Sequence, residues 1–275
     1  MVTALILVSA LLHACWNAFV KSDADKALSL GWIMGIGGVA SALALPFVPW
    51  PQPEVWPYLI ATTVLQNAYF VFVIQSYRNA DLSQAYPIAR GTAALLAAVF
   101  SAALGLDSLT QREWAGILIS SLGIASLSFT ARGSAASIFR GIAYPLASGT
   151  LTAAYSLVDG TGARVFGNPF AYVLWMNLCA SPFLPVWLWF RSRRGRISES
   201  STGLGARMGA AFIAMASYGL AVWAFSQGSI GRAAVLRETS VLFAAVLGSV
   251  VLKEPFGARR ILSAAVILAG FLIWR

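Results

Sequence analysis

The sequence has few charged residues for its length of 275. Asp, Glu, Lys and Arg make up 11% of it, whereas 59% of its residues are hydrophobic. Soluble globular chains are about a quarter charged, so this composition excludes a soluble protein with a charged surface. Uncharged runs such as 1–20, 27–53 and 165–190 reach the roughly 20 residues that cross a hydrocarbon core. The sequence therefore predicts a membrane protein embedded in the lipid bilayer.

The chain also lacks the residues that most catalytic and metal sites need. It has one histidine, His13, which excludes a multi-histidine metal site within the chain. There is no Walker lysine, no G-x-S-x-G and no H-E-x-x-H, so neither ATP hydrolysis nor a hydrolase centre is indicated. Cys15 and Cys179 each lie in an apolar run and are interpreted as packing residues. We expect no metal and no cofactor.

The net charge of +9 raises the possibility of nucleic-acid binding, which the placement of the basic residues argues against. These residues occur in short clusters between apolar runs, as in the cytoplasmic loops of inner-membrane proteins. Most of the loop lysines and arginines, including the cluster in 191–207, lie on one side of the predicted membrane. Only Arg112, Arg164, Arg232 and Arg275 lie on the other side. The positive-inside rule then places both termini outside the cytoplasm.

The apolar runs predict an all-α membrane protein with ten transmembrane helices. The predicted helices are 2–20, 28–49, 56–77, 83–104, 112–130, 141–159, 168–190, 208–227, 231–252 and 258–274. Only helices satisfy their own backbone hydrogen bonds across lipid in runs of this kind. The first segment has no basic region before it, so we interpret it as a retained helix. A glycine-rich stretch, 31–40, is interpreted as a surface for close helix packing.

An internal repeat relates the two halves of the chain. Residues 83–124 align with 230–271 without a gap, so that Arg90 falls on Arg237 and Arg112 on Arg259. The predicted repeats are 1–130 and 138–275, with five helices each. Because five is odd, equivalent helices cross the bilayer in opposite directions, which predicts an inverted repeat.

Three charged residues fall clearly within predicted helices: Arg90, Arg237 and Glu238. A charge at the centre of a transmembrane helix costs about 2.5–3.5 kcal/mol on insertion scales, so such residues usually face the bundle interior. Either arginine offers a bidentate site for a substrate carboxylate. The alternative is that Arg237 and Glu238 pair with polar groups of other helices and stabilise the bundle.

The first helix carries His13, Trp16 and Asn17, which are spaced to share one face. The imidazole of His13 and the carboxylate of Glu238 are both candidates for proton coupling. A histidine inside a membrane can instead serve as an interhelical hydrogen-bond partner. Trp16 and Asn17 are expected to line a cavity, because an amide avoids lipid.

Further polar and aromatic residues occur at mid-depth in other predicted helices and are expected to complete a binding cavity. They are Gln66, Tyr86, Tyr155 and Tyr218. Each is also compatible with an ordinary contact between helices. Pro87 and Pro145 are predicted to kink or break their helices, and broken helices mark binding sites in transporters. The second, fifth, seventh and tenth helices carry fewer such groups and are expected to be peripheral.

The chain resembles the EamA branch of the drug/metabolite transporter superfamily. Three stretches carry the resemblance: His13-Ala-Cys-Trp-Asn17-Ala-Phe-Val-Lys21, Gln84-Ala-Tyr86-Pro-Ile-Ala-Arg90-Gly91, and Leu236 to Phe243 with its continuation Leu252 to Phe256. The resemblance implies secondary transport by alternating access, with a central cavity between the repeats. It also implies export of amino acids or other small metabolites, or movement of drugs and lipid-linked sugars.

The function expected from these features is export of a small carboxylate-bearing metabolite, such as an amino acid, across the inner membrane. Arg90 or Arg237 would bind the carboxylate. The alternatives are a flippase for a lipid-linked or amphipathic substrate and a multidrug exporter. A membrane-embedded enzyme or assembly subunit is a distant alternative, since catalytic carboxylates are too few. Because both repeats are in one chain, we expect the monomer to be the working unit.

Overall fold

The structure, a computed structural model, consists of helices throughout the part of the chain that it describes. It describes residues 1–23, 25–79, 82–126, 135–192 and 202–250, together with positions 266, 269, 270 and 273. The helices are α1 (Val2–Ser22), α2 (Lys26–Ala44), η1 (Leu45–Phe47), η2 (Pro53–Val55), α3 (Trp56–Asn79), α4 (Leu82–Ala103), α5 (Gln111–Ser126), α6 (Ala135–Phe166), α7 (Pro169–Ala180), α8 (Phe183–Ser192), α9 (Leu204–Gln227), α10 (Ile230–Arg237) and α11 (Ser240–Val250).

Five stretches of this structure are long and apolar enough to cross a membrane. They are Val2–Val20, Lys26–Phe47, Pro53–Ser76, Pro169–Phe190 and Leu204–Gln227. The prediction of an all-α, multi-pass membrane protein is confirmed. The predicted tenth helix, 258–274, lies largely outside the described residues, so the count of ten is not established.

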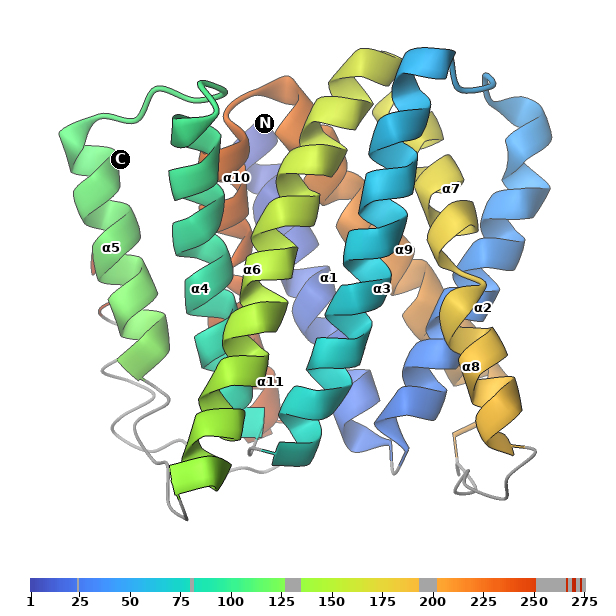
Figure 1. Ribbon diagram of the computed structural model, residues 1–275, viewed down its shortest axis with the longest axis horizontal. Coiled ribbons are helices and arrows are strands. Elements are labelled where there is room, and N and C mark those ends of the chain that lie inside the picture. The colour runs from blue at the N-terminus through green and yellow to red at the C-terminus, as the bar shows by residue number, and fades with distance from the viewer. Residues whose placement is uncertain are drawn as a thin grey trace.

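The helices run alongside one another as a bundle (Figure 1), with α1, α4, α6, α9 and α10 packed around a shared apolar core. Buried side chains from all five helices meet there: Ile6, Ala97, Leu157, Phe225 and Ile230. Many of the remaining core residues are alanines. Small side chains let helix backbones approach closely, and inside a membrane this packing is a main source of stability.

Two predicted helices are interrupted. The predicted helix 168–190 is divided into α7 and α8 at Ser181 and Pro182, since proline has no N–H to continue the hydrogen-bond pattern. The predicted helix 231–252 is divided into α10 and α11 at Glu238 and Thr239. At the second break the Thr239 hydroxyl donates to the carbonyl of Leu236 at 2.7 Å, an alternative to regular helix bonding.

The prediction that Pro87 breaks its helix is wrong, because α4 runs through this position from Leu82 to Ala103. Pro145 likewise lies inside α6, which extends from Ala135 to Phe166 and is longer than the predicted 141–159. Transmembrane helices tolerate proline when neighbouring groups satisfy the freed carbonyl. The break predicted near Arg90 occurs instead at the aligned position of the second half, immediately after Arg237.

The glycine-rich face of α2 packs closely against neighbouring helices, as the sequence predicts. A Cβ at Gly38 would meet the side chain of Ser181, and one at Gly31 would meet Leu188. A Cβ at Gly37 would lie 3.6 Å from Met215 of α9. The interpretation of 31–40 as a packing surface is confirmed. The same closeness places α2 beside the central cavity, so the expectation that it is peripheral is wrong.

Polar contacts at one end of the bundle position the start of α10. The Asp107 carboxylate accepts from the Gly231 backbone N–H at 2.8 Å and from the Ser101 hydroxyl at 2.5 Å. Arg232 Nε lies 2.6 Å from Glu113 Oε1 of α5. These contacts tie α10 to the segments at the end of α4, so the residues at the far end of α10 are held at a defined depth in the bundle.

Candidate functional site

Arg90 of α4 lies in a buried ion pair with Glu238, which follows α10. Arg90 Nη1 is 3.3 Å from Glu238 Oε1 and 3.5 Å from Oε2, and the side chains are 6% and 4% exposed. Separating either partner from the other would leave a buried charge without compensation. The pair joins the two halves of the chain. It matches the alternative prediction that Glu238 pairs with a polar group of another helix and stabilises the bundle.

His13 of α1 lies between the two arginines. Arg90 Nη2 contacts His13 Nε2, and Arg237 Nη2 lies 3.3 Å from His13 Nδ1. A guanidinium only donates hydrogen bonds, and a neutral imidazole has one N–H and one acceptor nitrogen. The imidazole can therefore accept from only one arginine, and its N–H then faces the other. If it accepts from Arg90 at the closer contact, its Nδ1–H and Arg237 are two donors facing each other.

Arg237 is the arginine that reaches the central cavity. Its side chain is buried, its Cζ lies 5.1 Å from the centre of the Tyr218 ring, and its Nε has no hydrogen-bond partner among the described residues. Buried donors are nearly always paired in proteins, so each unpaired donor needs an explanation. An acceptor bound in the cavity, such as a carboxylate, would satisfy it.

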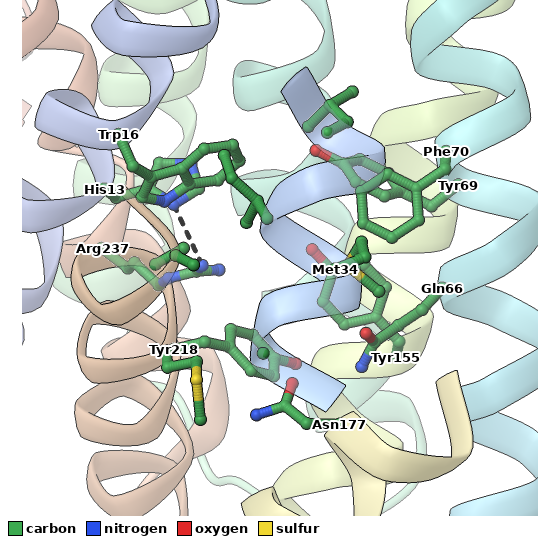
Figure 2. Close-up of a pocket in the computed structure, with 16 residues that line it drawn as sticks. His13, Trp16, Met34, Gln66, Tyr69, Phe70, Tyr155, Asn177, Tyr218 and Arg237 are labelled. Atoms are coloured by element: carbon green, nitrogen blue, oxygen red, sulfur yellow. Dashed lines mark hydrogen bonds between the residues drawn. The ribbon is translucent and has the colours of Figure 1, made fainter. Parts of the chain in front are cut away.

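The central cavity has a volume of about 100 Å³ and lies between α1, α2, α3, α6, α7, α9 and α10. In Figure 2, Trp16, His13 and Arg237 lie on one side of it and Phe70, Tyr69 and Gln66 on the other. The Asn177 amide also lines the cavity, and its Nδ2 is a second buried donor without a described partner. The cavity thus combines aromatic walls with donors that lack acceptors.

Most of the predicted site residues converge on this cavity. Those that line it are His13, Trp16, Gln66, Tyr155, Tyr218 and Arg237. Trp16 packs edge-on against His13, with ring centres 5.0 Å apart, and Tyr155 packs in the same way against Tyr218 at 5.9 Å. Arg90 and Glu238 lie behind His13, outside the lining.

Two predicted residues lie elsewhere. Tyr86 stacks under the Arg90 guanidinium, 5.1 Å from its Cζ, and lines a separate cavity of about 20 Å³ between α3, α4 and α6. Asn17 donates to the backbone carbonyl of His13 at 2.8 Å and does not line the central cavity. Its amide is satisfied within its own helix, so the structure gives it no contact with the cavity.

The sequence places Asp159 one turn after Tyr155, near the end of its predicted helix and among the polar groups that could form a cavity, but not among the residues predicted to bind substrate or protons. The predicted helix ends at Asp159, whereas α6 continues for two further turns, so the residue lies well inside the bundle. The carboxylate is fully buried and accepts from Tyr172 at 2.9 Å and from the Tyr218 hydroxyl. Tyr155 and Asp159 are four residues apart, so the sequence predicts that they share one helix face.

A second, larger hollow faces outward between α2, α8 and α9. Its volume is about 610 Å³ and apolar residues line it, among them Trp32, Val39, Trp189 and Phe212. Arg207 stacks on Trp32 near the end where α9 begins, with its Cζ 5.0 Å from the ring centre. None of the residues that line this groove is among the buried unpaired polar groups of the described chain, although Arg207 beside it has an unpaired Nε.

The described residues offer no cluster of three or more His, Cys, Asp or Glu side chains that could hold a metal ion. Cys15 and Cys179 are both free thiols. The residues that line the central cavity offer ion pairing, hydrogen bonding and stacking on aromatic rings.

Comparison with known proteins adds a family and a fold. Residues 139–274 match the sequence profile of the EamA-like transporter family. No curated protein sequence matches the chain. A crystal structure described only as that of a protein superimposes with a TM-score of 0.78 over 99% of this chain and 97% of its own, at 20% sequence identity. At that identity the likeness concerns the fold alone.

Proposed function

Because residues 139–274 match the EamA-like transporter family, we propose that the protein is an inner-membrane secondary transporter that exports a small carboxylate-bearing metabolite, such as an amino acid. The observation that carries this proposal is the unpaired donor of Arg237 in an aromatic-walled cavity. A substrate carboxylate at this point would accept from Arg237 and from the His13 N–H that faces it. In the tautomer that accepts from Arg90, the substrate would thereby separate two donors that face each other.

The size of the cavity favours a small substrate over a drug-sized one. Pockets for drug-sized ligands measure about 300–1,000 Å³. The central cavity, at about 100 Å³, suits a molecule of a few heavy atoms. Trp16, Tyr155 and Tyr218 would enclose its apolar part, and Gln66 and Asn177 would bind its polar groups.

We propose that Arg90 has a different role from Arg237. It is already compensated by Glu238 and contacts His13, so it holds the imidazole in place rather than binding substrate. Glu238 balances one of the two positive charges and leaves the cluster with a net positive charge toward the cavity. An anionic group would be attracted to that remaining charge.

Alternating access would follow from an inverted repeat of two five-helix units, residues 1–130 and 138–275. Three features support the repeat. Figure 1 shows α1 and α6, the first helices of the two units, running in opposite directions. The packing is reciprocal: α6 contacts α3 and α4 of the first unit, while α1 contacts α9, α10 and α11 of the second. Arg90 and Arg237, aligned in the repeat, meet on opposite nitrogens of His13. With both units in one chain, the monomer would suffice for transport.

The test is transport in proteoliposomes that contain the purified protein. Labelled alanine is expected to exchange across the membrane, and unlabelled alanine is expected to compete. Alaninamide has the same size and ammonium group without the carboxylate, so it should compete poorly. If alaninamide competes as well as alanine does, carboxylate recognition by Arg237 is wrong. If none of a panel of small amino acids exchanges, the proposed substrate class is wrong.

The outward groove favours one second candidate, movement of an amphipathic or lipid-linked substrate. An acyl chain would lie along the apolar lining between α2 and α9, and Arg207 at one end would meet an anionic headgroup. A fluorescent phosphatidylglycerol in proteoliposomes tests this. If the protein exposes inner-leaflet lipid to a quencher that cannot cross the membrane, it moves lipid. If quenching stops at the outer leaflet, this candidate is excluded for that lipid.

A further inference from the structure

The buried carboxylate of Asp159 is surrounded by neutral hydrogen-bond donors from three helices. Tyr172 of α7 donates to Oδ1 at 2.9 Å, and the Tyr218 hydroxyl of α9 donates to Oδ2. Gln66 of α3 places its amide nitrogen 3.4 Å from Oδ2. Asp159 itself belongs to α6 and is 0% exposed. The carboxylate thus lies where both halves of the chain meet, directly behind the wall of the central cavity.

Asp159 differs from Glu238 in having no basic partner among the described residues. Glu238 pairs with Arg90 at 3.3 Å, whereas the donors to Asp159, among them Tyr172, Tyr218 and Gln66, are uncharged. An isolated buried charge is costly, and gaining a proton removes that cost. Hydrogen bonds to a carboxylate oppose this by stabilising the ionised form. The surroundings of Asp159 therefore suit both states of the group, whereas the charge of Glu238 has a guanidinium partner in Arg90.

The charge of Asp159 is coupled to the cavity through Gln66 and Tyr218, which both line it, and Tyr218 also contacts Arg237. When Asp159 is ionised, the Tyr218 hydroxyl donates to it. When Asp159 is protonated, its own O–H needs an acceptor, and the Tyr218 oxygen can take that role only by turning its hydroxyl hydrogen elsewhere. The ring of the same tyrosine lies under the Arg237 guanidinium and lines the cavity. Protonation of Asp159 thus changes the surroundings of Arg237, where the substrate carboxylate would bind.

The remaining titratable groups near Asp159 are few. Tyr58 of α3 and Cys179 of α7 lie near Tyr172. Arg237 of α10 lies over the ring of Tyr218, whose hydroxyl donates to Asp159. Asp159 is therefore the one carboxylate among these groups. Gain or loss of its proton would change the charge next to the cavity wall.

We propose that Asp159 is the proton-binding site that couples transport to the proton gradient, a statement that rests on the proposed transport function. In each cycle the Asp159 carboxylate takes one proton from water on one side of the membrane and becomes a neutral carboxylic acid. It releases that proton on the other side after the cavity has changed its access. The Tyr218 hydroxyl reverses its hydrogen bond at each step and so links the proton to the occupancy of Arg237.

The first test needs no substrate. Infrared difference spectra of the purified protein, recorded between about pH 5 and pH 8, report carboxyl groups that gain a proton. We expect a protonated-carboxyl band that is present in the wild type, absent in Asp159→Asn and unchanged in the control Glu54→Gln, which alters an exposed carboxylate. The Tyr218→Phe variant keeps the ring and removes one donor, so its band should appear at higher pH. A band that persists in Asp159→Asn overturns the proposal.

The second test separates coupling from substrate binding in proteoliposomes. In Asp159→Asn, uptake of labelled alanine driven by a proton gradient should fall by about tenfold or more, whereas alanine exchange without a gradient should continue. Gradient-driven uptake measured in Glu238→Gln tests the rival proton-binding residue, Glu238. If Asp159→Asn retains gradient-driven uptake, the assignment to Asp159 is wrong. If the wild type exchanges no alanine, the proposed function fails, and the infrared result still decides whether Asp159 binds a proton.

Discussion

At the scale of single residues, the His13 ring separates two arginines whose roles differ. Arg90 has a carboxylate partner in Glu238, while Arg237 faces the cavity with an unpaired Nε. The sequence repeat treats the two arginines as equivalent. Only the position of Glu238, which follows one of them and pairs with the other, makes them unequal.

Replacing Arg237 by lysine is expected to weaken substrate binding while keeping the positive charge. Lysine is a point charge and cannot offer two parallel N–H groups to a carboxylate. Losing one charge-assisted hydrogen bond of about 1.5–3 kcal/mol should raise the KM for alanine exchange by roughly ten- to a hundredfold. The matched control is Arg112→Lys, an exposed arginine at the start of α5 that lies outside the cavity. An equal effect of the two changes would contradict the role given to Arg237.

Removing the charge of Glu238 is expected to destabilise the protein through Arg90. The Glu238→Gln variant leaves the buried Arg90 guanidinium without its carboxylate, a change that typically costs about 3–5 kcal/mol. Thermal unfolding in detergent should show a clear loss of melting temperature. The double variant Arg90→Gln with Glu238→Gln removes both charges and should regain part of it. If the double variant is less stable than either single one, the two residues do not act as a compensated pair.

At the scale of helices, close packing of α4 on α6 sets the geometry of the site. Gly149 of α6 lies against α4, where an added Cβ would come within 2.7 Å of Thr92 Cβ and would also meet the carbonyl oxygen of Ala89. Ala89 precedes Arg90, so displacing this backbone would displace the guanidinium. A single small residue on α6 thus helps to fix the position of Arg90.

The Gly149→Ala variant is therefore expected to lower both thermal stability and alanine exchange, because α4 and α6 must move apart. Overpacking of this kind typically costs about 1–3 kcal/mol. Gly209→Ala is the matched control, since nothing lies within 4 Å of its added Cβ. That control should leave exchange unchanged. If Gly149→Ala had wild-type stability and exchange, α4 and α6 would be able to move apart without loss of stability, and this contact would not fix the position of Arg90.

At the scale of the whole molecule, the asymmetry of loop charge predicts its orientation in the membrane. The ends of the bundle that carry Lys21, Arg78 and the cluster in 191–207 should face the cytoplasm, with both termini outside. An alkaline phosphatase reporter fused after Arg275 should be active, and a fluorescent protein fused there should be dark. The converse pair of signals would reverse the assigned orientation.

The sequence by itself determined that this is an all-α membrane protein. Hydropathy and the length of apolar runs depend on the thickness of the lipid bilayer and not on how the helices pack. The apolar runs gave the helices, and the glycines of 31–40 indicated a close-packed surface. Six of the predicted site residues line one cavity, since polar groups in a membrane bundle turn inward to avoid lipid.

Only the tertiary structure decided which charges meet. Helix periodicity places residues on a face but does not say which face of another helix lies opposite, so the pairing of Arg90 with Glu238 could not be predicted. The same holds for Asp159, whose burial depends on the length of α6 and on hydroxyls from α7 and α9. The composition of the chain decides that it enters the membrane. Which side chains contact one another is decided by how the helices pack, and the site consists of such contacts.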